Sequence, residues 1–161
     1  MKITTRGRYA LRATLALAKL GGQDGTSVPV STLSEVENIS SIFLEQIFFK
    51  LRKAGIVTSV RGPGGGFCFA RPLDELTVRE ILEAAGEDLD FVSCDKQTED
   101  CDRLGFCLAH SVWSEVTRLV NDYFSSVTLA EIIAKNKISG LAGSSAGSRR
   151  AEELDDGSIG A

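Results

Sequence analysis

The stretch that most constrains the fold is a glycine-rich turn between two short apolar runs. Ile56–Val60 is rich in β-branched residues and predicts a strand, Arg61–Gly66 predicts a tight turn, and Phe67–Ala70 predicts the returning strand. A glycine-rich loop can also cradle a nucleotide phosphate, but this one precedes a strand rather than a helix and lacks the Lys-Ser/Thr of a P-loop. The sequence therefore predicts a β-hairpin, with Cys68 in the core between two phenylalanines.

Two short helices joined by a tight turn are predicted immediately before this hairpin. A Thr-x-x-Glu capping box at residues 32–35 starts the first helix, and Asn38 ends it. Ser40-Ser41 open a second helix, Ile42–Ala54, with Gly55 as its left-handed cap. Such a pair is a helix-turn-helix, and a hairpin directly after it makes a winged helix. The second helix of this motif can enter the major groove of DNA.

The charge of the chain is divided unevenly. Residues 1–71 carry ten Lys/Arg and four Asp/Glu, a net charge of +6. Residues 72–161 carry eight Lys/Arg and eighteen Asp/Glu, a net charge of −10. A basic front half on an acidic protein suggests a polyanion partner for that half, with an uneven scatter of surface charge as the alternative. Arg6, Arg8 and Arg12 lie in the first turns of a helix predicted from Thr4-Thr5, where they either face solvent or contact phosphate.

A second constraint is the stretch from Cys94 to His110, which holds three of the four cysteines and the only histidine. Its spacing is C-x6-C-x5-C-x2-H, at Cys94, Cys101, Cys107 and His110. Thiolate and imidazole bind iron–sulfur clusters, zinc and copper. Zinc sites usually pair their ligands as C-x2–4-C, and this stretch has no such cysteine pair. We therefore expect an iron–sulfur cluster, with structural zinc and a thiol–disulfide switch as the alternatives.

A long amphipathic helix is predicted after this stretch, from about Leu108 to Ser126. Its apolar residues recur every three or four positions over roughly 28 Å, at Val112, Trp113, Val116, Leu119, Val120, Tyr123, Phe124 and Val127. A small winged helix cannot bury this whole stripe, so we expect a homodimer, with packing inside the monomer as the alternative. Capping boxes at 77–80 and 128–131 start two shorter helices, and the second of them is predicted to end near Asn136. Residues 87–90 are mostly acidic and are predicted to form a linker.

Together these elements predict a mainly α fold. We expect a winged helix-turn-helix DNA-binding domain with a two-stranded β wing over residues 1–72, a cluster-binding loop and dimerisation helices over 73–136, and a disordered tail over 137–161. No run approaches the roughly 18 apolar residues of a membrane span, and no apolar segment precedes a cleavage site near the start. We therefore expect a cytoplasmic protein with no membrane partner. In a reducing cytosol, clustered cysteines favour metal or cluster binding over disulfides.

Over roughly residues 1–135 the chain resembles the IscR family of bacterial winged-helix repressors, named after the iron–sulfur cluster regulator. The matching pieces are, in order, Thr5–Ala10, Leu44–Phe48, Leu51–Gly55, Ser59–Phe67 and Cys107-x-x-His110. The resemblance implies a homodimeric transcription factor that binds double-stranded DNA and controls iron–sulfur assembly genes. It also implies a 2Fe–2S cluster whose ligands are Cys94, Cys101, Cys107 and His110.

The resemblance also assigns the DNA contacts. It places Glu45 and Gln46 on base-contacting positions and Arg61 on the wing arginine, where the negative potential of a minor groove favours Arg. The DNA-binding residues that we expect are Arg6, Ser40, Ser41, Glu45, Gln46, Lys50, Arg52, Arg61, Gly62 and Gly64. Ile42 stands where close relatives have a serine, and the first cysteine gap is one residue longer than theirs. Nitric-oxide-sensing members take a carboxylate ligand from the first helix, where this chain has Arg8, which argues against that branch.

The expected mechanism is ligand-gated DNA recognition. Cluster loading would order residues 91–107 and shift which sequences bind, with Glu45 as a discriminating residue that can accept a hydrogen bond from cytosine N4. An electron-transfer protein or cluster carrier could use the same ligands but would need no recognition helix or wing. An enzyme is not expected, since no nucleophile–base pair is present and the single histidine is a predicted ligand.

Overall fold

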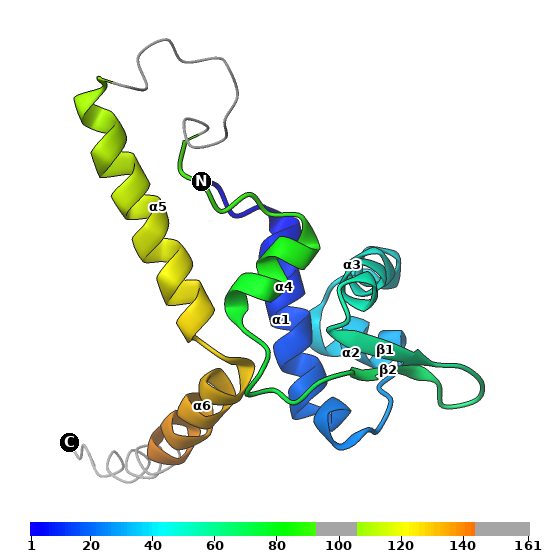
Figure 1. Ribbon diagram of the computed structural model, residues 1–161. Coiled ribbons are helices and arrows are strands. Elements are labelled where there is room, and N and C mark those ends of the chain that lie inside the picture. The colour runs from blue at the N-terminus through cyan, green and yellow to red at the C-terminus, as the bar shows by residue number, and fades with distance from the viewer. Residues whose placement is uncertain (93–105, 144–161) are drawn as a thin grey trace, which may run out of the picture.

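The structure is a computed structural model in which residues 1–92 and 106–143 are described. Its elements are α1 (Thr5–Lys19), the 3-10 helix η1 (Gly22–Asp24), α2 (Val30–Glu37), α3 (Ser41–Lys53), β1 (Val57–Val60), β2 (Gly66–Phe69), α4 (Val78–Ala85), α5 (Leu108–Ser126) and α6 (Leu129–Gly143). Figure 1 shows α1 and α4 at the centre, with α2, α3 and the hairpin on one side and α5 on the other. The predicted mainly α fold with a two-stranded wing is confirmed.

The hairpin forms as the sequence predicts. β1 and β2 pair antiparallel, with Val57 opposite Phe69 and Val60 opposite Gly66. The helix that precedes them, α3, ends before Gly55, whose φ of +71° is the left-handed conformation expected of a glycine cap. The recognition helix is therefore joined to its wing by a short turn, as in a winged helix.

The start of α2 differs from the prediction. Its N-cap is Pro29, so Thr32 already lies in the first turn, and the predicted capping box of Thr32 with Glu35 is wrong. The reason lies in a contact across the chain, because the amide and carbonyl of Val28 both bond to Phe67 of β2, at 2.9 Å each. This bridge extends the sheet by one residue and fixes the chain immediately before Pro29, so that α2 begins earlier than its local sequence suggests.

One hydrophobic core joins the winged helix to the helices that follow it. Its fully buried members come from α1, α2, α3, α4 and α6 and from the segment before α4, and include Leu17, Leu33, Leu44, Phe48, Leu76, Ile81 and Leu129. Cys68 is buried as well, as predicted. The core is therefore continuous across residue 72, where the sequence predicts a domain boundary, because residues from both sides of that position belong to one cluster.

The helix α5 leaves this body at one end, as Figure 1 shows. Its C-terminal part packs through Phe124 and Val127 on a second apolar cluster that includes Val78 and Leu82 of α4. The Val78 amide also donates to the Val127 carbonyl at 3.0 Å. The predicted bounds of this helix are confirmed, and its C-terminal end is fixed to the start of α4.

The helix α6 starts with the predicted capping box, since the Glu131 amide donates to the Thr128 hydroxyl at 3.2 Å. It continues to Gly143, beyond the predicted end near Asn136, so residues 137–143 of the predicted disordered tail are helical. The rest of the predicted tail, residues 144–161, lies outside the described residues. Among the helices of the described chain, none has the length and apolar character needed to span a membrane.

Candidate DNA-binding surface and metal-binding residues

The exposed face of α3 carries the residues predicted to contact bases. The Ser40 hydroxyl accepts a hydrogen bond from the Phe43 amide at 3.3 Å and so caps the helix. One face of α3 is buried in the core, through Leu44, Ile47, Phe48 and Leu51. Ser41, Glu45 and Gln46 are exposed on the rest of the helix. The N-terminal half of α3, which contacts base edges in helix-turn-helix proteins, is thus accessible and presents three polar side chains.

A shallow hollow of about 560 Å³ joins the start of α1 to this face. It is lined by Arg6 of α1 and, from α3, by Ile42, Glu45, Gln46, Phe49, Lys50 and Lys53. The structure therefore brings the predicted contact Arg6 beside the predicted base readers. Ile42, Phe49 and Lys53 are not in the predicted set. An apolar residue on the polar face of a recognition helix is the sequence signal that could have identified the first two.

Two predicted DNA contacts on α3 have partners within the protein. The Lys50 ammonium donates to the Ala85 carbonyl at 3.1 Å, at the C-terminal end of α4, where the helix dipole favours a cation. Arg52 donates to the Ser59 hydroxyl at 3.2 Å and lies over the ring of Phe49, 5.7 Å from its centroid. Lys50 therefore ties α3 to α4, and Arg52 ties α3 to the wing. Their contacts with DNA stay predictions.

The wing turn presents the three residues predicted there. Arg61, Gly62 and Gly64 are all exposed, and the two glycines have φ values of +101° and +74°, which residues with side chains rarely adopt. The Ser27 hydroxyl donates to the Gly64 carbonyl at 2.8 Å and so holds the turn to the segment before α2. The hairpin turn projects from the body, as Figure 1 shows. Arg61 is the exposed cationic residue of this turn.

The arginines of α1 have different roles. The guanidinium of Arg12 donates to the Glu37 carboxylate at 2.9 Å and to the Glu37 carbonyl at 2.7 Å, at the C-terminal end of α2. Arg8 is exposed and donates to the Thr5 hydroxyl at 3.2 Å. Arg12 thus holds α1 to α2, whereas Arg6, in the hollow, is the arginine of this group best placed for a phosphate.

Two of the four predicted cluster ligands lie at the start of α5. Cys107 is the N-cap residue of the helix and is half-buried, and its carbonyl accepts a hydrogen bond from the His110 amide at 3.1 Å. The Nε2 atom of His110 lies 3.4 Å from the hydroxyl of Ser114, one turn further along.

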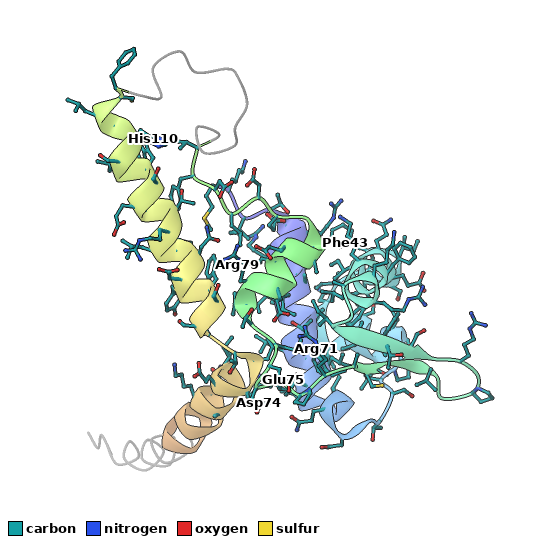
Figure 2. All side chains as sticks on the ribbon, viewed as in Figure 1. Phe43, Arg71, Asp74, Glu75, Arg79 and His110 are labelled. Atoms are coloured by element: carbon teal, nitrogen blue, oxygen red, sulfur yellow. The ribbon has the colours of Figure 1, made fainter. Side chains whose placement is uncertain are left out.

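The donor set of Cys107 and His110 fits a soft metal centre. A thiolate and an imidazole in one helical turn are ligands of iron–sulfur clusters and zinc alike. The other two predicted ligands, Cys94 and Cys101, lie outside the described residues. Among the residues that are described, no three His, Cys, Asp or Glu side chains form a metal-binding group. Figure 2 shows His110 near the N-terminal end of α5, on the other side of the molecule from Phe43 of α3.

The segment that leads from α4 toward the cysteine stretch is attached to the N-terminal end of α1. The buried carboxylate of Glu87 accepts hydrogen bonds from the Thr4 amide at 2.9 Å, the Gly7 amide at 3.1 Å and the Thr4 hydroxyl. Burial alone would raise the pKa of Glu87, but these hydrogen bonds and the nearby charge of Arg6 together lower the pKa below its ordinary value. The predicted acidic linker is therefore wrong for Glu87, which is part of the fold.

The same segment also touches α5. The Phe91 amide donates to the Thr117 hydroxyl at 3.3 Å, and the Phe91 carbonyl accepts from the N-terminal ammonium of Met1 at 3.2 Å. Thr117 is the buried residue of α5, seven positions after His110. A continuous set of contacts thus leads from α5 through residues 87–91 to the start of α1, where Arg6 enters the α3 hollow.

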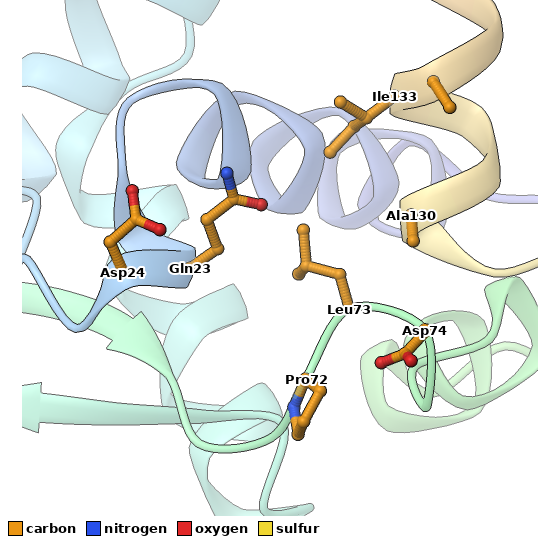
Figure 3. Close-up of a pocket in the computed structure, with 8 residues that line it drawn as sticks. Gln23, Asp24, Pro72, Leu73, Asp74, Ala130 and Ile133 are labelled. Atoms are coloured by element: carbon orange, nitrogen blue, oxygen red, sulfur yellow. The ribbon is translucent and has the colours of Figure 1, made fainter.

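A second hollow, shown in Figure 3, lies between η1, the segment before α4, and α6. Gln23 and Asp24 line one side, Pro72, Leu73 and Asp74 another, and Ala130, Ile133 and Ala134 of α6 complete it. Its lining has two carboxylates and no Lys, Arg, His or Cys. This chemistry suits neither a phosphate nor a thiolate-bound metal, so we assign it no part in the candidate site.

A winged helix with an accessible recognition helix that bears polar side chains, a projecting cationic wing and a basic α1 defines a DNA-binding transcriptional regulator. Comparison with known proteins agrees with this class. A family model described as Rrf2, an iron-dependent transcriptional regulator, matches residues 3–135. The chain therefore belongs to the Rrf2 family.

Individual relatives indicate which type of Rrf2 regulator the chain is. An HTH-type transcriptional regulator from Neisseria meningitidis is 44% identical over 133 residues, which cover 83% of this chain and 88% of the relative. The regulator IscR of Photorhabdus laumondii is 38% identical over 143 residues, covering 89% of this chain and 85% of IscR. The structure of CymR, the global cysteine regulator of B. subtilis, matches with a TM-score of 0.69 at 27% identity, covering 84% of this chain and 98% of CymR. The chain is an IscR-type Rrf2 regulator, as the resemblance predicts.

Proposed function

We propose that the protein is a cytoplasmic homodimer that regulates transcription according to iron–sulfur status. Its ligands for a 2Fe–2S cluster would be Cys94, Cys101, Cys107 and His110, and its targets would include iron–sulfur assembly genes. The observation that carries the proposal is the position of Cys107 and His110 in the first turn of α5, in a chain 38% identical to an IscR. A thiolate and an imidazole at a helix start form half of a cluster site, with two cysteines close before it in the sequence.

The proposed role of the chain in sensing follows from the position of Cys107 and His110 at the start of α5, a helix that contacts residues 87–91. A bound 2Fe–2S cluster supplies a redox-active centre whose formation depends on iron and sulfide. The imidazole of His110 can ligate only as its neutral form, which makes binding sensitive to protons. Ligation would fix the chain after residue 92 to the start of α5. Since residues 87–91 contact both Thr117 and the start of α1, this constraint can bias the position of Arg6 beside α3.

The proposal of a homodimer rests on the exposed stripe of α5. Val112, Trp113, Leu119 and Tyr123 are between 43% and 64% exposed, although they recur at helical spacing along one element. A second copy that packs on this stripe would bury large apolar side chains, whose transfer out of water is favourable. Two α3 helices of a dimer would then contact half-sites that are one helical turn of DNA, or a multiple of it, apart.

A thiol–disulfide switch is the second candidate. The match to a structure of Staphylococcus aureus CymR in an oxidized form favours it, because a change at cysteine thiols could act through the same segment without a metal. Structural zinc at the same four residues is the third candidate, since its ligand types are identical. Each candidate keeps the DNA-binding surface and changes only what the cysteines hold.

Anaerobic purification with absorption spectroscopy and metal analysis tests the proposal. We expect visible absorption bands and about two iron and two sulfide per chain. Cys107→Ala and His110→Ala should lose the bands, whereas Cys68→Ala, at a buried core cysteine, should keep them. One zinc per chain without visible bands would overturn the cluster in favour of zinc. A metal-free protein with a reversible disulfide would favour the thiol switch.

A further inference from the structure

Ile42 is the most exposed large apolar side chain of the described part of α3. It is 73% exposed, in the first turn of the helix, and it lines the hollow that also contains Arg6, Glu45 and Gln46. An isoleucine in this position is unfavourable in water, since its apolar surface stays hydrated. It also belongs to neither hydrophobic core cluster, so the fold as described does not account for it.

The other apolar side chains on the outer part of α3 have neighbours that explain them. The ring of Phe49 lies under two cations, with the Arg52 guanidinium 5.7 Å and the Lys53 ammonium 5.5 Å from its centroid. The ring of Phe43 packs edge-on against Tyr9, with centroids 5.9 Å apart. Ile42 thus differs from both, because it projects apolar surface into the region where bases would lie.

We propose that Ile42 determines sequence specificity by contacting the C5 methyl group of a thymine in the major groove. The inference rests on the proposed DNA-binding role of α3 and deepens it. The thymine methyl is the apolar feature that distinguishes the four base pairs in the major groove, and apolar side chains are its usual partners. Residues in the N-terminal part of a recognition helix contact base edges, and Ile42 is the second residue of α3.

The position of the thymine follows from the spacing along α3. Ile42 and Glu45 are three residues apart and line the same hollow, so their side chains are neighbours on one helix face. The rise between them along the axis is about 4.5 Å, close to the spacing of about 3.4 Å between successive bases. We therefore expect the thymine within about one or two base pairs of the base that Glu45 contacts, for which cytosine is the natural choice.

The test begins with a binding-site selection on the full chain, purified anaerobically, which gives the preferred duplex. Each thymine of that duplex is then replaced in turn by deoxyuracil, which lacks only the C5 methyl group. Dissociation constants are measured at fixed salt for the wild type, Ile42→Ala and Ile42→Val. The matched control is Val36→Ala, since Val36 is 56% exposed but lies on α2, outside the hollow. Thermal melts check that every variant is folded.

We expect one thymine in each half-site at which deoxyuracil weakens wild-type binding by about fourfold, the effect of one methyl group at about 0.8 kcal/mol. Ile42→Ala should bind the thymine and deoxyuracil duplexes equally. Ile42→Val should keep part of the discrimination, and Val36→Ala should keep all of it.

Three outcomes separate this inference from the proposed function. If no deoxyuracil substitution matters, or if Ile42→Ala retains the full discrimination, the role of Ile42 is overturned while the DNA-binding function stands. An equal loss of affinity by Ile42→Ala on every duplex also overturns it, because that pattern reports altered packing rather than base readout. If the wild type selects no sequence and shows no salt-dependent binding, the proposed function itself fails.

Discussion

A single buried carboxylate, that of Glu87, connects the segment before the cysteine stretch to the DNA-binding half of the protein. Three donors, two amides and one hydroxyl, converge on it from the first turn of α1. The backbone at Gly7 comes so close to this carboxylate that a Cβ there would overlap the Glu87 side chain. Glycine at position 7 is therefore required by the close approach, and the carboxylate acts as a cap for α1 supplied from a distant part of the chain.

The first prediction concerns the pH dependence of stability. The pKa of Glu87 is lowered in the folded protein, so its contribution is present above the unfolded pKa and is lost as pH falls through the folded pKa. Glu87→Gln places an amide donor opposite the donors of Thr4 and Gly7, and should cost about 1–3 kcal/mol at neutral pH. The difference from the wild type should shrink between about pH 5 and pH 2. Urea unfolding at several pH values measures both quantities.

The control for this prediction is Glu83→Gln, which changes an exposed carboxylate on α4 that pairs with Arg79. It should change stability by no more than about 0.5 kcal/mol. A Glu87→Gln protein as stable as the wild type at pH 7 would show that the three hydrogen bonds contribute nothing net.

The second prediction concerns Glu45, which is exposed in the hollow of α3. A carboxylate accepts a hydrogen bond from cytosine N4 and is repelled by base edges that offer only acceptors. Glu45→Ala should therefore relax sequence choice, reducing discrimination at one position of each half-site by about 1–3 kcal/mol. A binding-site selection repeated with the variant measures this loss. Unchanged selectivity would exclude Glu45 as a discriminating residue.

At the scale of elements, local sequence signals predicted those boundaries that depend on local chemistry. Asn38, in the left-handed conformation, ends α2 where the sequence places its stop. The Thr77–Glu80 capping box is present with both of its hydrogen bonds. The start of α2 was predicted wrongly because the bridge between Val28 and Phe67 is a contact between distant residues. Local patterns carry no information about such a contact.

The third prediction concerns α5 as the dimer element. Leu119 is 53% exposed within its apolar stripe, so Leu119→Glu should leave the monomer fold intact while placing a charge in the interface. We expect the dimer dissociation constant to rise by about two orders of magnitude. Light scattering across a concentration series measures it. Ser125→Glu, an exposed change on the same helix outside the stripe, is the control and should leave the dimer unchanged.

If Leu119→Glu associates as strongly as the wild type, the dimer interface lies elsewhere. A wild-type chain that is monomeric at all concentrations would exclude the proposed homodimer altogether.

At the scale of the whole molecule, the winged helix and the regulator class could be predicted from the sequence, but the connections between the parts could not. The hairpin, α3 and the amphipathic α5 each have a local pattern that predicts them. By contrast, the pairing of Arg12 with Glu37, the contact of Lys50 with Ala85 and the burial of Glu87 all join distant segments. The sequence could indicate neither that Lys50 contacts α4 nor that Glu87 is buried against α1, because packing decides both contacts.

These long-range contacts also define the proposed route for regulation. α5 bears two of the predicted ligands, residues 87–91 contact both α5 and α1, and Arg6 lies beside the recognition helix. A change at the cysteine stretch can therefore reach the DNA surface through one packed body, provided that it alters the position of residues 87–91.

The most direct test of ligand-gated recognition is a binding-site selection performed in parallel on anaerobically purified cluster-loaded protein and on protein stripped of iron. We predict different preferred sequences for the two forms, with the difference abolished by Cys107→Ala and retained by Cys68→Ala. Identical preferences and affinities for both forms, at the same salt concentration, would contradict a role for the cluster in recognition.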